Sequence, residues 1–448
     1  MRELQSVSWG IQQYGQAMRP LQHNDKMKKY IVTVIAGLLV VQTSSAGLTN
    51  RYVVKGNAGA AIPYDSPANA AGDIQTAINY AYAGETVLVA AATYDSGGIT
   101  NWPSGGRLTN RVAVTKILTL QSLSNDPAAT IIRGAGPCGP SAVRGVYLLN
   151  GARLVGFTVS EGCSMTTTVY SSSDTQGAGI YCPGTATVIS NCIVAGNTCY
   201  GYGGGIMQGY VFNSRIVSNS ANMSSGAHSC ILSNCDLSYN RANTIQTWNT
   251  AYGGGAGCTL YNCIVSYNYA LSGGGLGNAI MYNCLVYGNQ ASYGGGVYGS
   301  FNLNNSTIAG NYASGYGGGL LAESAGTRPV INCIVYSNGA SSYPEWRTNA
   351  AGAIIAFTNS CALTQMAGWN VSNITNNPLF AACGNGYGTN HVPGDYRLQA
   401  KSPCVNTGTN QPWMNDALDL DGKKRLRYGR VDMGAYEVIY DGTVYVMH

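Results

Sequence analysis

One short pattern of polar and apolar positions recurs seven times between residues 191 and 338. Each copy reads Asn, a small residue, a variable residue, an aliphatic residue, two further positions and a second Asn, as in 191–197. Four of the six steps between copies are nearly equal and two are longer, with the leading Asn at Asn191, Asn213, Asn234, Asn262, Asn283, Asn305 and Asn332. A period of about 21 residues predicts a solenoid, in which each coil buries its apolar face against its neighbours.

The positions around the leading Asn predict which side chains point inward. The residue two places before it is always apolar and the residue one place before it has no common character, an alternation typical of a half-buried strand. After the Asn comes a small residue, then a position that tolerates Arg215 or Asp236, then an aliphatic residue. Because the inward positions flank the Asn at odd spacing, we expect a bend between two strands there.

Two further sets of residues keep the same register. Stacked coils lie about 4.8 Å apart, so we expect the leading asparagines to bond to one another along the stack and to satisfy backbone groups at the bend. A second Asn set marks another tight corner: Asn197, Asn219, Asn240, Asn268, Asn289, Asn311 and Asn338. Glycine clusters follow at 203–205, 253–255, 273–275, 294–296 and 317–319. Glycine suits a bend that needs positive φ or close backbone approach.

The alternation of Gly-Gly-Gly-aliphatic with aliphatic-x-x-Asn-x-Ala resembles the right-handed parallel β-helices of the pectin-lyase-like superfamily. It is especially similar to the repeats of polymorphic outer-membrane proteins. The resemblance implies an all-β fold in which each coil has three strands and a length set by the repeat period. It also implies a short β/α cap at the N-terminal end and a second cap at the C-terminal end.

The chain before residue 47 has the features of an export signal. Met27, Lys28 and Lys29 form a basic start, 31–41 is apolar, and small residues precede a cleavage position before Gly47. We therefore expect residues 1–26 to be a mis-annotated upstream extension and 27–46 a signal peptide. The apolar run is too short to span a membrane, so no integral membrane segment is expected in the mature chain. The protein is predicted to be secreted or held at the cell surface.

The mature chain is predicted to divide into an N-terminal cap at 47–111, a β-helix at 112–375 and a C-terminal capping region at 376–448. Residues 73–81 have helical spacing and 86–90 read as a strand. Single strands are also expected at 117–121, 130–133, 146–149 and 154–159. The motifs at 377–380, 395–398, 402–404, 419–422 and 431–437 resemble the end of choice-of-anchor Q domain proteins.

The charge of the chain argues against a nucleic-acid partner, and the positions of its cysteines indicate which could form disulfides. Removing residues 1–46 takes away five basic and two acidic residues, so the formal charge falls from +5 to +2. The remaining basic residues form no stripe of the kind that nucleic-acid binders need. Five of the fourteen cysteines occupy one inward position, whereas Cys361, Cys383 and Cys404 are better disulfide candidates.

No zinc-site spacing occurs, and no cofactor is expected. Asp416, Asp419, Asp421 and Gly422 leave calcium as an alternative, although pairing with the basic residues of 423–427 explains them equally well.

Catalysis would have to use the flanks of the repeat. A glycoside hydrolase needs two carboxyl groups about 5 to 9.5 Å apart, yet 175–322 contains only Arg215, Asp236 and Arg241 as charged residues. Further acids lie on the C-terminal flank at Glu323, Glu345 and Asp395. The catalytic candidates chosen are Glu161, Asp174, Arg144 and Arg153. Ordinary surface and turn charges are the simpler interpretation.

A candidate binding surface is aromatic. Tyr202, Tyr252, Tyr293 and Tyr316 each precede a glycine cluster, and Trp248 lies on an insertion beside them. Aromatic faces beside a flat glycine surface suit stacking on sugar rings or packing on a partner protein. Stacking that only braces the solenoid is the alternative.

These features favour an exported, non-catalytic cell-surface or extracellular β-helix that binds a polysaccharide or a surface protein, as an adhesin does. One alternative is a polysaccharide lyase or glycoside hydrolase of the pectin-lyase-like superfamily. The other is a structural subunit of an envelope or filament.

Overall fold

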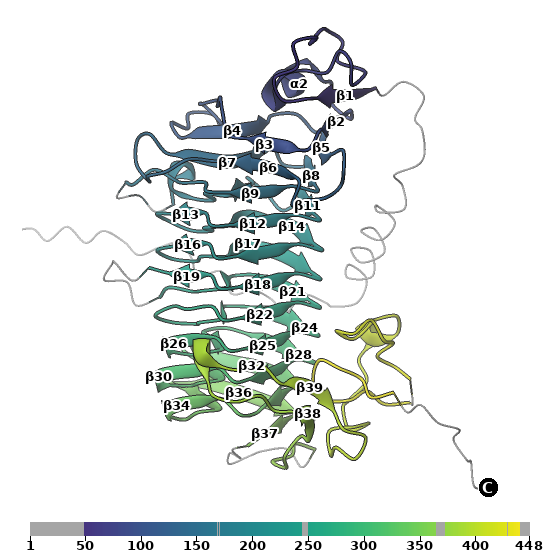
Figure 1. Cartoon of the computed structure of the whole chain (residues 1–448). Helices are drawn as coiled ribbons and strands as arrows, with labels where there is room; N and C mark the ends of the chain where they lie inside the picture. Colours follow the sequence, from purple (N-terminus) through teal and green to yellow (C-terminus); the bar gives the residue numbers. More distant parts are fainter. Residues whose placement is uncertain are drawn as a thin grey trace, which may run out of the picture.

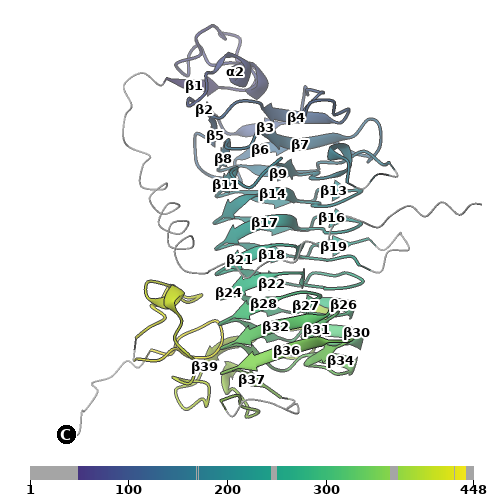
Figure 2. The same cartoon turned by 180° about the vertical axis from the view of Figure 1, so that it is seen from behind.

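The computed structural model describes residues 49–439 except 168, 170, 244–249, 364–371 and 428. The described chain is an elongated stack of parallel coils, seen from two sides in Figures 1 and 2. This confirms the predicted all-β parallel β-helix. The predicted signal peptide, the segment 1–26 and Trp248 lie outside the described residues.

Three sets of parallel strands form the faces of the stack. The largest sheet has 20 strands and takes two short strands from most coils: β1 (Asn50–Val53), β2 (Thr86–Val89), β4 (Thr109–Val114), β5 (Thr119–Ser122), β7 (Val143–Leu148), β8 (Arg153–Val155), β10 (Ile180–Tyr181), β11 (Val188–Ser190), β14 (Ile206–Phe212), β17 (Ala227–Ser233), β20 (Gly255–Ala256), β21 (Thr259–Tyr261), β23 (Leu276–Gly277), β24 (Ile280–Tyr282), β27 (Val297–Tyr298), β28 (Asn302–Asn304), β31 (Leu320–Ala322), β32 (Gly326–Ile331), β35 (Trp346–Thr348) and β36 (Ala353–Thr358).

The second sheet has 11 strands in chain order: β3 (Ala92–Tyr94), β6 (Thr130–Arg133), β9 (Thr158–Ser160), β12 (Ile193–Ala195), β15 (Arg215–Val217), β18 (Asp236–Ser238), β22 (Ile264–Ser266), β25 (Leu285–Tyr287), β29 (Thr307–Ala309), β33 (Ile334–Val335) and β37 (Cys361–Ala362). The third face consists of two groups of three: β13 (Thr198–Cys199), β16 (Ser220–Ala221) and β19 (Arg241–Ala242), then β26 (Gln290–Tyr293), β30 (Tyr312–Tyr316) and β34 (Gly339–Ser342).

The stack begins earlier than the predicted boundary at residue 112. β1 already pairs in parallel with β2, and β2 with β5. The predicted helix is α2 (Ile74–Tyr80), and the Asp73 carboxylate caps it by accepting the Thr76 N–H at 2.8 Å. The single strand expected at 154–159 is divided between β8 and β9, because Gly156 adopts φ +79° between them.

The leading asparagines stand at the predicted bend. All seven have positive φ, between 43° and 55°, which Asn tolerates better than other residues with a side chain. Their amides join only in part along the stack, with bonds from Asn234 to Asn213, from Asn283 to Asn262 and from Asn332 to Asn305. The expected bonding along the stack at this corner is therefore confirmed at these three steps and not as an unbroken ladder.

The continuous ladder is formed by the second Asn set. The Nδ2 of each donates to the Oδ1 of the Asn in the next coil at 2.8–3.0 Å, from Asn197 through to Asn338. Each Oδ1 also accepts the backbone N–H of the preceding ladder residue, as Asn311 does from Asn289 at 3.0 Å. These side chains point into the turn, where water cannot reach them, so every donor and acceptor must be paired within the protein.

In most clusters the third glycine lies against both the next coil's backbone and this ladder, whereas in 253–255 the second glycine, Gly254, does so. A Cβ at Gly205 would stand 2.6 Å from the carbonyl oxygen of Gly226 and 2.9 Å from the amide nitrogen of Asn219. The backbone and the ladder together leave no room for a side chain, so only glycine fits there. The first glycine of most clusters has the positive φ expected at a bend, 66° at Gly203 and 71° at Gly317.

The ladder ends at Glu345, which occupies the register position of the third glycine in the last coil. Its backbone carbonyl accepts from Leu320 as its counterparts do in earlier coils. Its carboxylate takes the place of the missing next asparagine, accepting Asn338 Nδ2 at 2.7 Å and the Asn338 N–H at 3.3 Å.

The interior is filled by aliphatic side chains and by one rung of thiols. Cys192, Cys235, Cys263, Cys284 and Cys333 are buried at the predicted inward position, and all fourteen cysteines are free thiols. Cys361 and Cys404 belong to one buried apolar cluster, whereas Cys383 is exposed.

The C-terminal region lies along the side of the last coils. β38 (Phe380–Ala382) pairs antiparallel with β39 (Asp395–Leu398), and the short 3-10 helices Gly388–Asn390 and Pro412–Met414 flank them. Phe380, Tyr396 and Met433 cover the outward Leu285 and Ile334 of the 11-stranded sheet. Figure 1 shows this segment, coloured yellow-green to yellow, beside the lower coils.

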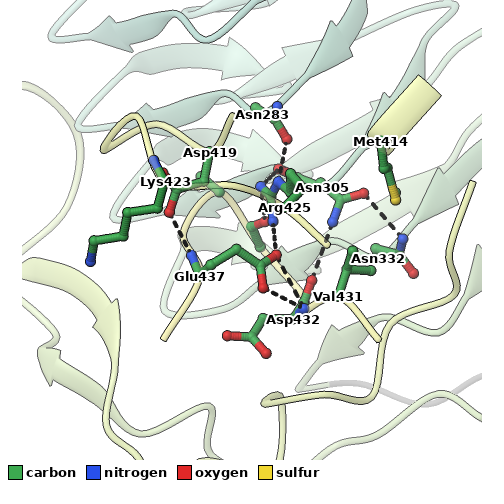
Figure 3. A network of polar contacts seen from close by, with 12 residues as sticks. Asn283, Asn305, Asn332, Met414, Asp419, Lys423, Arg425, Val431, Asp432 and Glu437 are labelled. Atoms are coloured by element: carbon green, nitrogen blue, oxygen red, sulfur yellow. Dashed lines mark hydrogen bonds and ion pairs between the residues drawn. The ribbon is translucent and has the colours of Figure 1, made fainter. Parts of the chain in front are cut away.

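One buried arginine fastens this region to the stack. Arg425 donates to Glu437 Oε1 at 2.7 Å, to Asn283 Oδ1 at 2.7 Å and to the Gly434 carbonyl at 2.7 Å (Figure 3). Asn305 and Asn332 of the leading set donate to the carbonyls of Asp432 and Thr409. The C-terminal motifs therefore supply corner asparagines with further partners, beyond the bonds that these make along the stack. We call residues 404–438 the C-terminal strap.

No helix in the described part of the chain is long and apolar enough to cross a membrane.

Candidate functional site

The predicted catalytic side chains of Asp174 and Arg144 are buried and form hydrogen bonds with backbone groups. Asp174 accepts the N–H groups of Arg107 and Leu108 at 3.0 Å, which ties the loop before β4 to the turn at 173–175. Arg144 is fully buried and donates to the Gly177 carbonyl, to Asn110 and to carbonyls of the same turn. Burial lowers the pKa of Arg144 to about 10. Both side chains hold loops in place.

Glu161 and Arg153 have different surroundings. Glu161 is exposed at the end of β9, with its carboxylate 3.3 Å from Arg133 Nε. Arg153 is half-buried on β8, in register with Thr119 and Val188. The carboxylates of Glu161 and Asp174 thus have separate partners and form no direct contact with each other. The flanking acids Glu323 and Asp395 likewise bind Asn349 and Arg397.

The tyrosine row is only partly in register, and serines interrupt it at two coils. Ser224 forms β-bridges with Tyr202 on one side and Tyr252 on the other, and Ser272 forms one with Tyr293. Between these two parts the register shifts by one residue, because the Ser272 N–H donates to the Ala251 carbonyl and Tyr252 aligns with Gly273. Ser224 is hard to place from the sequence, because its coil has Ser-Ser-Gly where the others have three glycines.

Tyr202 and Tyr252 are half-buried against residues of the neighbouring coils. The Tyr202 ring lies 4.7 Å from that of His228, whose pKa burial lowers to about 4. The Tyr252 ring covers Gly277 of the next coil, where a Cβ would be 2.1 Å from a ring carbon, and it approaches Tyr298 at 6.1 Å. Burial raises the pKa of Tyr252. These two tyrosines pack against the solenoid.

Tyr293 is exposed and Tyr316 half-buried, and their rings extend into a longer stack. Their ring centroids are 4.9 Å apart, and the Arg347 guanidinium lies 4.0 Å from the Tyr316 ring and 4.8 Å from the Tyr343 ring. Tyr293 is 39% and Tyr343 58% exposed. We call Tyr293, Tyr316, Arg347 and Tyr343 the aromatic–arginine strip. It spans three successive coils at the edge formed by β26, β30 and β34, which Figures 1 and 2 place on one side of the stack.

The strip combines the features needed to bind an extended polar polymer. The rings offer flat apolar faces and phenol hydroxyls, and Arg347 adds a fixed positive charge with several N–H donors. Because Arg347 is held between two rings, its position costs little further ordering when a ligand binds. Repetition at each coil gives the surface the periodicity of the stack.

Sequence reasoning missed Tyr343 and Arg347 because the last coil lacks the glycine cluster that marks the others. Tyr343-Pro344-Glu345-Trp346 replaces Tyr316-Gly317-Gly318-Gly319-Leu320 with one residue fewer. The sequence does contain a signal for Tyr343, which is its spacing. Tyr343 follows Tyr316 by the same number of residues as Asn332 follows Asn305.

The acidic motif considered for calcium is part of the C-terminal strap. Asp419 accepts the N–H groups of Asp421, Lys423 and Glu437, and Asp421 pairs with Arg397 at 2.6 Å. Asp416 is exposed. Among the described residues, no group of three or more His, Cys, Asp or Glu side chains is arranged to hold a metal ion.

Comparisons with known proteins concern the fold. The pectate lyase Pel9A superposes with a TM-score of 0.52 at 15% identity, covering 87% of this chain and 97% of the lyase. A rhamnogalacturonan lyase matches with a TM-score of 0.33 at 14% identity, covering 70% of this chain and 87% of its own. No protein-family model matches the chain, and neither does any curated protein. The likeness to the pectate lyase agrees with the parallel β-helix fold of the described chain.

Proposed function

We propose that the protein is an exported β-helix that binds a polysaccharide along its side through the aromatic–arginine strip. The observation that carries this proposal is the continuous stack of Tyr293, Tyr316, Arg347 and Tyr343 across three coils, exposed at both ends.

Binding without cleavage is favoured by the partners of the charged groups. Asp174 and Arg144 are occupied by backbone groups, and Glu161 is paired with Arg133. A retaining or inverting hydrolase instead requires two carboxyl groups facing one substrate. The pectate lyase that shares the fold acts on a polysaccharide by its name, which supports a glycan as the ligand class.

Replacing both Tyr293 and Tyr316 with Ala tests the proposal. Ring stacking contributes about 0.5–1.5 kcal/mol per aromatic beyond area burial, so the double variant is expected to weaken binding roughly tenfold or more. Affinity electrophoresis in gels containing polygalacturonate or a neutral β-glucan measures this effect, with ultraviolet absorbance reporting any unsaturated product.

Tyr82→Ala is the matched control, because Tyr82 is 69% exposed beside α2 at the far end of the stack. It should leave migration unchanged. Retained binding in the double variant would rule out the strip as the site, and release of unsaturated products or new reducing ends would replace binding with catalysis.

A further inference from the structure

The asparagine ladder does not explain why its last member is a carboxylate. The Asn338 amide and N–H need only an oxygen acceptor, and an amide oxygen supplies it at each earlier step. Glu345 is 2% exposed, and burial raises its pKa to about 7. A buried carboxylate costs several kcal/mol of desolvation that a glutamine would avoid. The charge therefore calls for a role outside the ladder.

Glu345 forms part of the wall of a cavity of about 450 Å³ at the end of the third face. Three tyrosines line it together with Glu345: Tyr312, Tyr336 and Tyr387. The Tyr387 ring lies over Gly339, where a Cβ would be 2.7 Å from the ring, so glycine gives the cavity its aromatic side wall. The remaining lining is Ser337, Asn338, Ala340, Pro344 and Leu363, with no Lys, Arg or His among the described lining residues.

We infer that this cavity binds a small organic cation, with an ammonium group facing the tyrosine rings and Glu345 as its counter-charge. Aromatic rings attract a cation through their negative faces, and the attraction is strongest where water is excluded. A carboxylate behind the rings adds a Coulombic term that a neutral ligand cannot use. The same carboxylate would repel an anion.

This cavity is separate from the aromatic–arginine strip. The nearest basic side chain on the same segment, Arg347, points to the rings of Tyr316 and Tyr343 and is absent from the cavity lining. Loss of cation binding should therefore leave polysaccharide binding unchanged, and the two proposals can fail independently.

Isothermal titration of the full chain with choline, and with 3,3-dimethylbutan-1-ol as its uncharged analogue, tests the inference. Choline should bind and the alcohol should not. Because Glu345 must be ionised to attract the cation, choline affinity should rise roughly tenfold from pH 6 to pH 8. The other titratable groups facing Glu345 are the phenols of the three tyrosines and, behind Tyr336, the thiols of Cys361 and Cys383.

Glu345→Gln isolates the carboxylate, because its amide oxygen can still accept from Asn338. This variant should lose the pH dependence and at least tenfold in affinity at pH 8. Tyr387→Leu, at a half-exposed ring, should weaken choline binding without affecting the ladder. Equal binding of the alcohol, no choline binding at pH 8, or unchanged affinity in Glu345→Gln would overturn the inference.

Discussion

At the scale of single residues, the cluster glycines and the ladder asparagines pack against each other at the same turn. The ladder amide and the next coil's backbone together leave no room for a side chain at the glycine that faces them, as at Gly275, where a Cβ would lie 2.5 Å from the Gly296 carbonyl oxygen and 3.2 Å from the Asn289 amide. The amide then pairs with the coils on both sides of it. Glu345 replaces both residues in the last coil, since its side chain reaches the ladder from the glycine position.

The free energy of unfolding is expected to depend on pH through the buried carboxyl group of Glu345. Burial raises its pKa from 4.5 to about 7, so the folded protein holds this proton more tightly than the unfolded chain. Its stabilising contribution is fully present below pH 4.5 and is lost as pH rises through about 7. The loss is roughly 3 kcal/mol, from about 1.4 kcal/mol for each pKa unit.

Urea unfolding of the wild type and of Glu345→Gln at pH 5 and pH 8 measures this effect. The wild type should lose roughly 3 kcal/mol more than the variant between the two pH values. Asp432 and Glu437, whose pKa values burial also raises, contribute equally to both proteins and cancel. Equal losses in the two proteins would show that Glu345 does not titrate in this range.

The role of a residue can be predicted from this sequence only where the residue recurs in several coils. The seven-fold Asn register and the alternation around it predicted the fold, because a stack repeats the same constraint at each coil. Register alone did not show which Asn set points inward, since both recur with the same period. Glu345 and Tyr343 occur once each in the coil that lacks the glycine cluster, so comparison among repeats did not detect their roles.

At the scale of elements, the C-terminal strap protects the outer face of the last strands. Leu285 on β25 and Ile334 on β33 are outward residues of a sheet that would otherwise meet water, and the strap, together with Phe380 and Tyr396, buries them. Its anchor, Arg425, is fully buried with Glu437, Asp432 and Asp419 around it. Removing a single cation among buried carboxylates typically costs about 3–5 kcal/mol.

Arg425→Met should therefore release the strap while the earlier coils stay folded. Hydrogen exchange followed by mass spectrometry should show faster exchange in 404–438 and in β25, β29 and β33, with β12, β15 and β18 unchanged. Arg397→Met is the matched control, because its ion pairs with Asp395 and Asp421 are partly exposed and should contribute only about 0.2–1 kcal/mol. Uniform exchange across all coils, or none at all, would contradict an independent strap.

At the scale of the whole molecule, the proposed function depends on repetition. The strip presents Tyr293, Tyr316 and Tyr343 on three successive coils, with Arg347 beside the last two rings. A ligand that runs parallel to the stack contacts all three at once, and its affinity exceeds that of a ligand that reaches one ring. A ligand held in a closed pocket has no such dependence on length.

A length series of oligosaccharides from the polysaccharide that binds best tests this account most directly. Titration calorimetry should show affinity rising with each added sugar until the oligosaccharide spans Tyr293 to Tyr343, then levelling. In the Tyr293→Ala/Tyr316→Ala variant the rise should disappear. Affinity that is independent of length, or a length dependence that survives in the variant, would contradict binding along the aromatic–arginine strip.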